Sequence, residues 1–181
     1  IDEFNDSSGV DASASTNEVL TSGVYKGQTS STGNATGGTT STTGGYEYHL
    51  FKATTHDATN SVNFVTPGTG TIDYLIVGGG GSGRSTHAGT PAGGGGGSHQ
   101  LFTGQSKTAA TYAIVTGGGG SGWTSVNNGQ ASTAFGTTKA GGSYGNTTGH
   151  GHAGTQYSQF SQFGRTNTNT ETGTRGYFAG G

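Results

Sequence analysis

The sequence contains no cysteine and no methionine, and it has only two prolines and one tryptophan among its 181 residues. Without cysteine, disulfide bonds and thiolate metal sites are excluded. No apolar run reaches the roughly 18 residues of a membrane-spanning helix, and the N-terminus lacks the charged-then-apolar pattern of a signal peptide. We therefore expect no membrane insertion. Because the chain begins with Ile1 and lacks methionine, we expect a processed product or a fragment.

Charge is also scarce, since only 9% of the residues are charged and the formal net charge is −2. The seven Lys and Arg residues are scattered from Lys26 to Arg175 without forming a basic patch, which argues against nucleic-acid binding. No acidic residue occurs between Asp73 and Glu171, so paired-carboxylate catalysis has few candidates. We expect neither an enzyme nor a bound cofactor.

Glycine is abundant: it supplies 40 of the 181 residues, against an average usage of about 7%. Only 27% of the residues are hydrophobic, so the core must be thin. Low hydrophobicity with much Gly, Ser and Thr is typical of disorder. The low charge and the clustering of apolar residues into short alternating segments argue instead for an ordered, β-rich chain.

These alternating segments predict short strands. The stretch SVNFVTPGTGTIDYLIV predicts two strands joined by a turn at Pro67 and Gly68. Nothing has helical periodicity with caps, so no long helix is expected. The predicted fold class is all-β, with short antiparallel strands in a β-sandwich-like arrangement. The other predicted strands lie around residues 19–26 and at 46–51, 98–103, 110–116, 130–136 and 137–140.

One glycine motif imitates a nucleotide site: TIDYLIVGGGGSGR satisfies the spacing G-x-G-x-x-G at Gly78, Gly80 and Gly83. A dinucleotide site also needs a helix after the loop and an acid about 20 residues further on. Here Pro91 and five consecutive glycines follow, with no such acid. No Lys-Ser/Thr pair follows either, so both the dinucleotide and the phosphate-loop interpretations fail.

Three glycine tracts follow or precede apolar strands, and they predict a structural role. Glycine runs can form an extended helix with three residues per turn, and each residue keeps its N–H donor. Such segments can pack closer than any Cβ would permit. Flexible linkers are the alternative. We predict packed polyglycine-II-like segments formed by Gly78, Gly79, Gly80, Gly81, Gly93, Gly94, Gly95, Gly96, Gly97, Gly117, Gly118, Gly119 and Gly120.

The stretches YEYHLFKATTHDATNSVNFVTPGTGTIDYLIVGGGGSGR, GGGGGSHQLFT, TYAIVTGGGGSG and NNGQASTAFGTTKAGG resemble the glycine-rich domains of bacteriophage tail-fibre and tail-appendage proteins. The likeness covers about residues 44–145; TGQSKTAATYA lacks the proline usual in that family. The resemblance implies an adhesin at the virion surface, often trimeric. In related adhesins packed polyglycine helices form a rigid base, and distal loops bind a host receptor.

We predict three regions: an N-terminal arm or connector at 1–45, a glycine-rich β domain at 46–145 and a C-terminal extension at 146–181. If the tracts form the scaffold, recognition falls to exposed loops. Aromatic rings flanked by amides and hydroxyls suit a carbohydrate or an outer-membrane protein. The receptor-binding candidates are Trp123, Asn127, Asn128 and Tyr144, although Trp123 equally suits a place in the thin core.

For two further groups of side chains, the spacing in the sequence suggests a specific role. Tyr157, Phe160 and Phe163 recur every three residues, and we expect them to pack against a neighbouring strand or subunit. His150 and His152 would face the same way on a strand, so three chains around an axis could offer six imidazoles to a transition metal. A solvated histidine pair is the alternative.

Three hypotheses for function follow. The first is a non-enzymatic structural and adhesive module of a tail fibre or virion appendage, which acts as a homo-oligomer outside the cell and displays loops to a host glycan or outer-membrane protein. The second is a self-assembling subunit, either a virion decoration protein or an extracellular filament. The third is a glycan hydrolase that would depend on Asp73 and Glu171.

Overall fold

The computed structural model describes residues 18–21, 24–27, 34–43, 45–84, 92–122, 126–145, 154–161, 163 and 177–179. No helix of seven or more residues occurs in these ranges, so the predicted all-β class is confirmed, and none of their helical segments could span a bilayer. The elements are β1 (Glu18–Thr21), β2 (Val24–Gly27), β3 (Thr39–Thr43), β4 (Tyr46–Leu50), β5 (Thr59–Thr66), β6 (Gly70–Val77), β7 (His99–Lys107), β8 (Ala110–Gly117), β9 (Ser132–Ala134), β10 (Thr137–Lys139), β11 (Thr155–Gln156), the 3₁₀ turn η1 (Ser158–Phe160) and β12 (Tyr177–Phe178).

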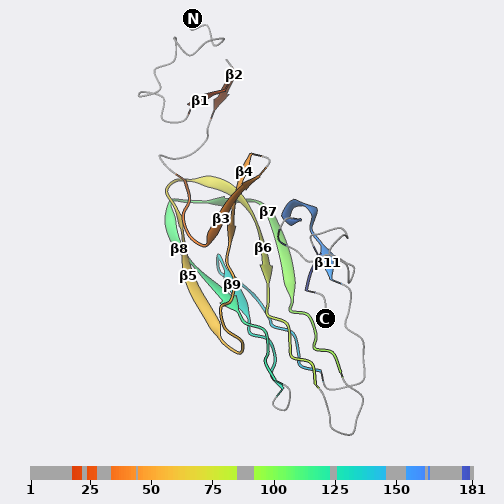
Figure 1. Cartoon of the computed structure of the whole chain (residues 1–181). Helices are drawn as coiled ribbons and strands as arrows, with labels where there is room; N and C mark the ends of the chain where they lie inside the picture. The colour runs from red at the N-terminus through yellow and green to blue at the C-terminus, as the bar shows by residue number, and fades with distance from the viewer. Residues whose placement is uncertain are drawn as a thin grey trace, which may run out of the picture.

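Two antiparallel sheets enclose the core (Figure 1). One sheet has the strand order β10-β9-β8-β5, and the other consists of β6 and β7. Phe64, Ile114 and Ala134 of the first sheet pack with Ile76 of the second, and each of the four side chains is less than 9% exposed. This small cluster is the thin core that the composition predicts.

The two strands predicted on either side of Pro67 are β5 and β6, but they do not pair with each other. β5 pairs with β8 in the register Phe64↔Tyr112, whereas β6 pairs with β7 in the register Leu75↔Leu101. The turn therefore carries the chain from one sheet to the other. Each strand has an apolar face, and crossing between sheets lets both faces meet in one core.

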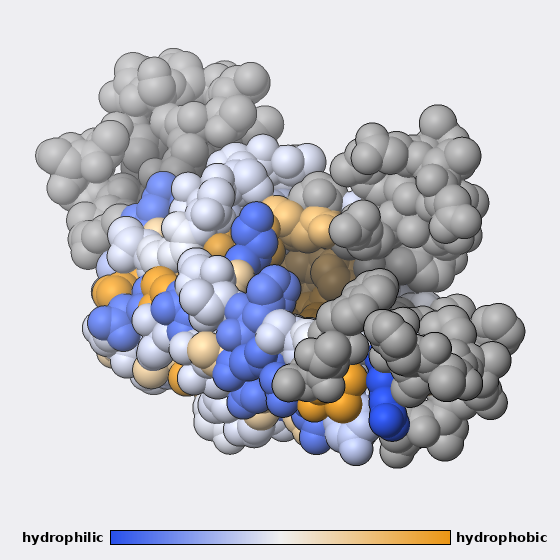
Figure 2. Space-filling model, turned by 60° about the horizontal axis from the view of Figure 1, so that its bottom comes forward, coloured by the Kyte–Doolittle hydropathy of each residue, from blue (hydrophilic) through white to orange (hydrophobic). Residues whose placement is uncertain are grey.

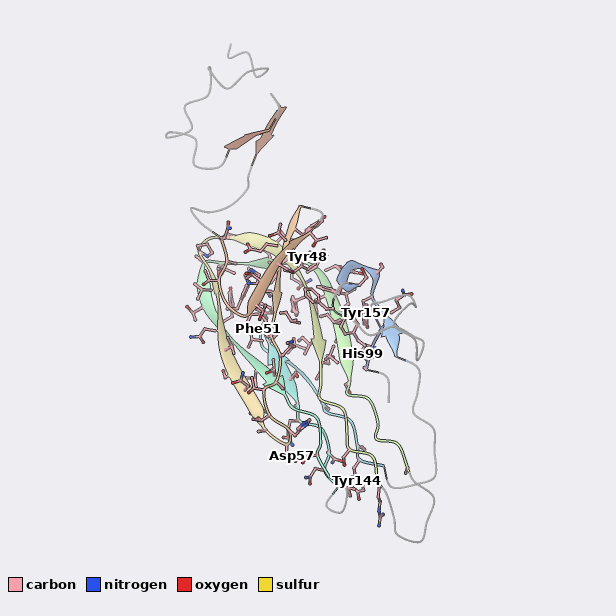
Figure 3. All side chains as sticks on the ribbon, in the orientation of Figure 1. Tyr48, Phe51, Asp57, His99, Tyr144 and Tyr157 are labelled. Atoms are coloured by element: carbon pink, nitrogen blue, oxygen red, sulfur yellow. The ribbon has the colours of Figure 1, made fainter. Side chains whose placement is uncertain are left out.

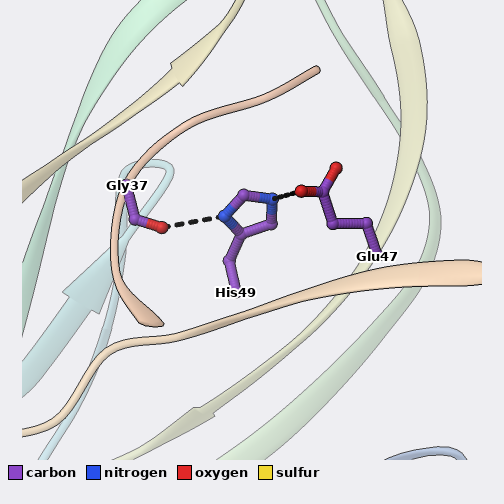
Figure 4. A network of polar contacts seen from close by, with 3 residues as sticks. All are labelled: Gly37, Glu47 and His49. Carbon is purple, nitrogen blue, oxygen red and sulfur yellow. Dashed lines mark hydrogen bonds and ion pairs between the residues drawn. The ribbon is translucent and has the colours of Figure 1, made fainter. Parts of the chain in front are cut away.

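The segment before β4 belongs to the β domain. β3 pairs with β4, and Thr36 forms a bridge with Val65 of β5. Figure 4 shows His49 Nδ1 donating to the carbonyl oxygen of Gly37 at 2.8 Å, with Nε2 3.9 Å from Glu47 Oε1. The predicted boundary between residues 45 and 46 thus falls inside a hairpin. Likewise, the single strand predicted around 19–26 is the hairpin β1–β2.

Beyond the sheets, the strands continue into a set of glycine-rich segments that we call the glycine bundle. Figure 1 shows them running side by side away from the sheets. Most of the hydrogen bonds that join the segments are lateral bonds between backbone groups. They comprise residues 55–58, 78–84, 92–98, 117–121, 127–131 and 140–145.

The hydrogen bonds of the central segment, 78–84, repeat every three residues. Its residues 78, 81 and 84 donate to residues 98, 95 and 92 of one neighbour, at 2.8 Å in each case. Its residues 79 and 82 donate to residues 130 and 127 of a second neighbour, at 2.9 and 3.1 Å. A third neighbour donates from residues 142 and 145 to the carbonyl oxygens of 79 and 82, at 2.8 and 2.9 Å. Because each turn contains three residues, every third residue of the segment faces the same neighbour.

The backbones in the bundle lie too close for side chains at most positions. A Cβ on Gly78, Gly81 or Gly97 would overlap a backbone carbonyl of the adjacent segment. At Gly80 the nearest atom would be Gly95 O, at 3.7 Å, which is an ordinary contact. The glycine requirement therefore depends on the side of the helix that a residue occupies.

Candidate functional site

The candidate site is the end of the glycine bundle that lies away from the sheets, which we call the bundle tip. Segments 78–84, 117–121 and 140–145 leave the ends of β6, β8 and β10, so they run in the same direction. Arg84 and Ala92, which flank residues 85–91, bond to each other there at 2.8 and 3.0 Å. Figure 3 places Tyr144 and Asp57 toward this end of the molecule.

Three of the four predicted receptor-binding residues meet at the bundle tip. Asn127 and Asn128 are exposed and Tyr144 is half-buried. The Asn128 side chain accepts a 2.9 Å hydrogen bond from the backbone N–H of Tyr144, which joins segments 127–131 and 140–145. Trp123 lies outside the described residues. The site thus presents an amide pair beside a tyrosine.

Ser82 holds this group to the central segment. It is 6% exposed, and its hydroxyl accepts the N–H of Asn127 at 3.0 Å. Its own N–H donates to the carbonyl oxygen of Asn127 at 3.1 Å, while its carbonyl oxygen accepts the N–H of Gly145. Sequence reasoning did not single out Ser82; the one available signal is a serine that interrupts the tract in GGGGSGR.

Asp57 clamps a further segment to the tip, and it too was missed. Its carboxylate accepts the N–H of Ser121 at 2.8 Å and also the Ser121 hydroxyl, and its own N–H donates to Gly119 O at 3.0 Å. Its φ of 56° lies in the left-handed region, which Asp tolerates better than most residues. The two hydrogen bonds from Ser121 lower the pKa of Asp57 below its ordinary value of 3.8.

Acidification should release the Asp57 clamp. Because the folded-state pKa is lowered, the stabilisation is full above about pH 3.8 and is lost as the pH falls through the lower folded-state value. Amide hydrogen exchange at Ser121 should therefore accelerate relative to other bundle amides as the pH is lowered below 3.8. Asp57→Asn, which also tolerates this φ, should abolish that pH dependence; an identical acid response in this variant would contradict the assignment.

The other predicted residues are not part of the tip. Figure 3 shows Tyr157 near His99 and Tyr48 above them, on the side of the sheets. The rings of Phe160 and Phe163 lie 6.3 and 5.7 Å from that of Tyr48, and the ring of Tyr157 lies 5.7 Å from that of His99. These aromatic residues pack against strands of the same chain, in and around η1.

The predicted metal ligands and the two acids of the hydrolase hypothesis form no site among the described residues. His150 and His152 lie outside the described residues, among which no cluster of three potential metal-ligating His, Cys, Asp or Glu side chains occurs. Asp73 Oδ1 accepts the N–H of Gly104 at 2.7 Å in an exposed contact between β6 and β7. Glu171, the other acid of the hydrolase hypothesis, is also outside the described ranges.

Comparison with known families agrees with the glycine-based architecture. A family model described as a glycine-rich domain matches residues 54–181, which is more than half of the chain. The chain belongs to this glycine-rich domain family. The matched range begins just before the bundle segment 55–58 and includes every later segment of the bundle. Neither the curated proteins nor the solved structures gave a match to this glycine-rich domain protein.

Proposed function

We propose that this glycine-rich domain protein is a non-enzymatic structural and adhesive module of a virion appendage such as a phage tail fibre. The glycine bundle is the rigid support, and the bundle tip is the binding surface. The observation that carries the proposal is the three-residue hydrogen-bond repeat of segment 78–84, which joins the tip segments into one array. A homo-oligomer at the outside of the virion would present several such tips together.

Rigidity favours binding because less conformational entropy is lost when the partner docks. At the tip, hydrogen bonds to Ser82 hold the backbone of Asn127, and the Asn128 side chain holds the backbone N–H of Tyr144, before any partner arrives. Amide and phenol groups suit the hydroxyls of a host cell-surface glycan or the polar surface of an outer-membrane protein. Figure 2, in which the lower end of Figure 1 comes forward, shows hydrophilic and neutral residues over much of the visible face, with hydrophobic residues in several separate groups, the largest of them in a hollow. Such a mosaic fits a polar partner.

Adsorption to whole cells tests the proposal. Fluorescently labelled full chain is incubated with a panel of Gram-negative strains, and bound protein is measured by flow cytometry. The combined variant Trp123→Ala and Tyr144→Ala should reduce adsorption by about tenfold or more, because aromatic residues dominate binding surfaces. Tyr144→Ala leaves the backbone N–H that Asn128 accepts, so the tip should keep its structure.

The matched control is Tyr46→Ala. Tyr46 is 69% exposed and lies in β4, at the end of the molecule opposite the bundle tip (Figure 1). This control should adsorb like the unmodified chain. Adsorption that survives the tip substitutions on every strain, or falls equally in both variants, would contradict binding through the tip. Release of reducing ends from the cell polysaccharide would contradict the non-enzymatic assignment.

A further inference from the structure

A second candidate binding site lies at the end of the sheets opposite the bundle tip. A cavity of about 420 Å³ opens between the end of β7, the start of β8 and the turn between β9 and β10. This volume is within the range of about 300–1,000 Å³ typical of small-molecule sites. The polar and aromatic side chains that line it belong to Ser106, Lys107, Thr108, Thr111, Tyr112 and Phe135.

Lys107 is a cation without a paired anion. Its ammonium lies 4.7 Å from the ring centroid of Phe135 and 5.4 Å from that of Tyr74. The ion pair found among the described residues is the one between His49 and Glu47, so no carboxylate there neutralises Lys107. Aromatic rings attract an ammonium but accept none of its three N–H donors in the manner of a carboxylate. The ammonium is therefore available for an anionic ligand.

The aromatic wall of the cavity is held in an unusual backbone conformation. Phe135 has φ 50° and Gly136 has φ 80°, the combination of a two-residue hairpin turn that favours Asn-Gly. The Phe135 ring packs against Tyr74 at 4.6 Å and Tyr112 at 5.1 Å. Phenylalanine is disfavoured at such a φ, and its ring is fixed both in the aromatic cluster and under the Lys107 ammonium.

Hydroxyl groups complete the lining. The Tyr112 hydroxyl donates to Thr108 O at 3.1 Å, which orients the phenol at the cavity. Ser106 and Thr111 are exposed beside it. A cation, an aromatic wall and hydroxyls match the three parts of an acidic sugar: its carboxylate, its apolar C–H face and its hydroxyl groups.

We propose that this cavity binds a carboxylated monosaccharide unit, with the carboxylate at the Lys107 ammonium and the sugar ring against Phe135 and Tyr112. The site is separate from the bundle tip, and it does not depend on the function proposed for the tip. It would give the protein a preference for uronate-containing polysaccharides over neutral ones.

Nuclear magnetic resonance titration of the full chain tests this site. Sodium D-glucuronate should shift the Phe135 ring and Lys107 side-chain signals in a saturable way. D-glucose, which has the same ring without the carboxylate, should bind about tenfold more weakly or worse, since one ion pair to a partly desolvated lysine is lost. Sodium acetate, which lacks the ring, should also bind about tenfold more weakly.

Variants assign the effect to the named residues. Lys107→Gln should remove the preference for glucuronate over glucose, whereas Lys139→Gln, in β10 and outside the lining, should keep it. Phe135→Asn should lose glucuronate binding because it removes the aromatic wall. The turn itself should be kept, because Asn-Gly is favoured in a two-residue hairpin turn. Equal affinities for glucuronate and glucose, or an unchanged preference in Lys107→Gln, would overturn the proposal. Acetate as tight as glucuronate would overturn the sugar assignment and leave an anion site only.

Discussion

Replacing Gly81 with alanine is expected to lower the free energy of unfolding by about 3 kcal/mol, whereas replacing its neighbour Gly80 should change it by less than about 0.5 kcal/mol. A Cβ at Gly81 would overlap the carbonyl oxygen of Ser143, and moving the backbone to avoid it would break the 2.8 Å bond from Gly81 N–H to Gly95 O. At Gly80 the new methyl group would meet Gly95 O at 3.7 Å. Urea unfolding followed by circular dichroism measures the difference.

This matched pair distinguishes packing from composition. Both substitutions remove one glycine from the same tract, so a flexible linker would respond equally to both. The same contrast should appear between Gly94 and Gly95, since a Cβ at Gly94 overlaps Gly81 O while one at Gly95 lies 3.4 Å from Ser143 O. If the variants of either pair were equally stable, the packed bundle would not be the source of rigidity.

The strands and the glycine tracts could be predicted because both depend on local sequence. Alternating apolar residues at 98–103 and 110–116 predicted β7 and β8, which are confirmed. The three tracts adjoin such strands, and glycine is the residue whose backbone can pack without a Cβ in between. The sequence also contains short glycine-containing stretches at 127–131 and 140–145, but these lack a run of four glycines and were not recognised as bundle segments.

Strand partners were the part of the fold that the sequence could not supply. Alternation defines which face of a strand is buried, but not which strand lies beside it. The two strands joined by the turn at Pro67 were predicted, but their partners were not: β5 bonds to β8, some 50 residues later, with eight residue pairs in register. The clamp between Asp57 and Ser121 is equally non-local, and neither residue has a sequence motif around it. Among the tip residues, Asn127, Asn128 and Tyr144 were predicted from amide and aromatic chemistry in glycine-rich surroundings.

Truncating Phe64 should have the largest effect of any substitution in the sheets. Phe64 is 6% exposed, and its ring contacts His49, Phe51 and Phe135 at centroid distances of 5.0, 6.1 and 6.0 Å. Phe64→Ala removes the largest side chain of a four-residue cluster, so we expect a loss of about 3–5 kcal/mol in the free energy of unfolding. That is a large share of the roughly 5–15 kcal/mol typical of a whole domain.

The same substitution tests whether the sheets and the glycine bundle unfold together. β6, β8 and β10 pass directly into bundle segments, and residues 92–98 and 127–131 lead directly into β7 and β9, so loss of the core should also release the glycine hydrogen bonds. Phe64→Ala should therefore advance unfolding by the same amount whether it is followed at aromatic signals of the core or at glycine amide signals of the bundle. Phe64→Leu, which keeps most of the buried volume, should retain most of the stability. A glycine transition left in place while the aromatic transition moves would mean that the bundle is stable on its own, and that the sheets contribute little to holding the tip.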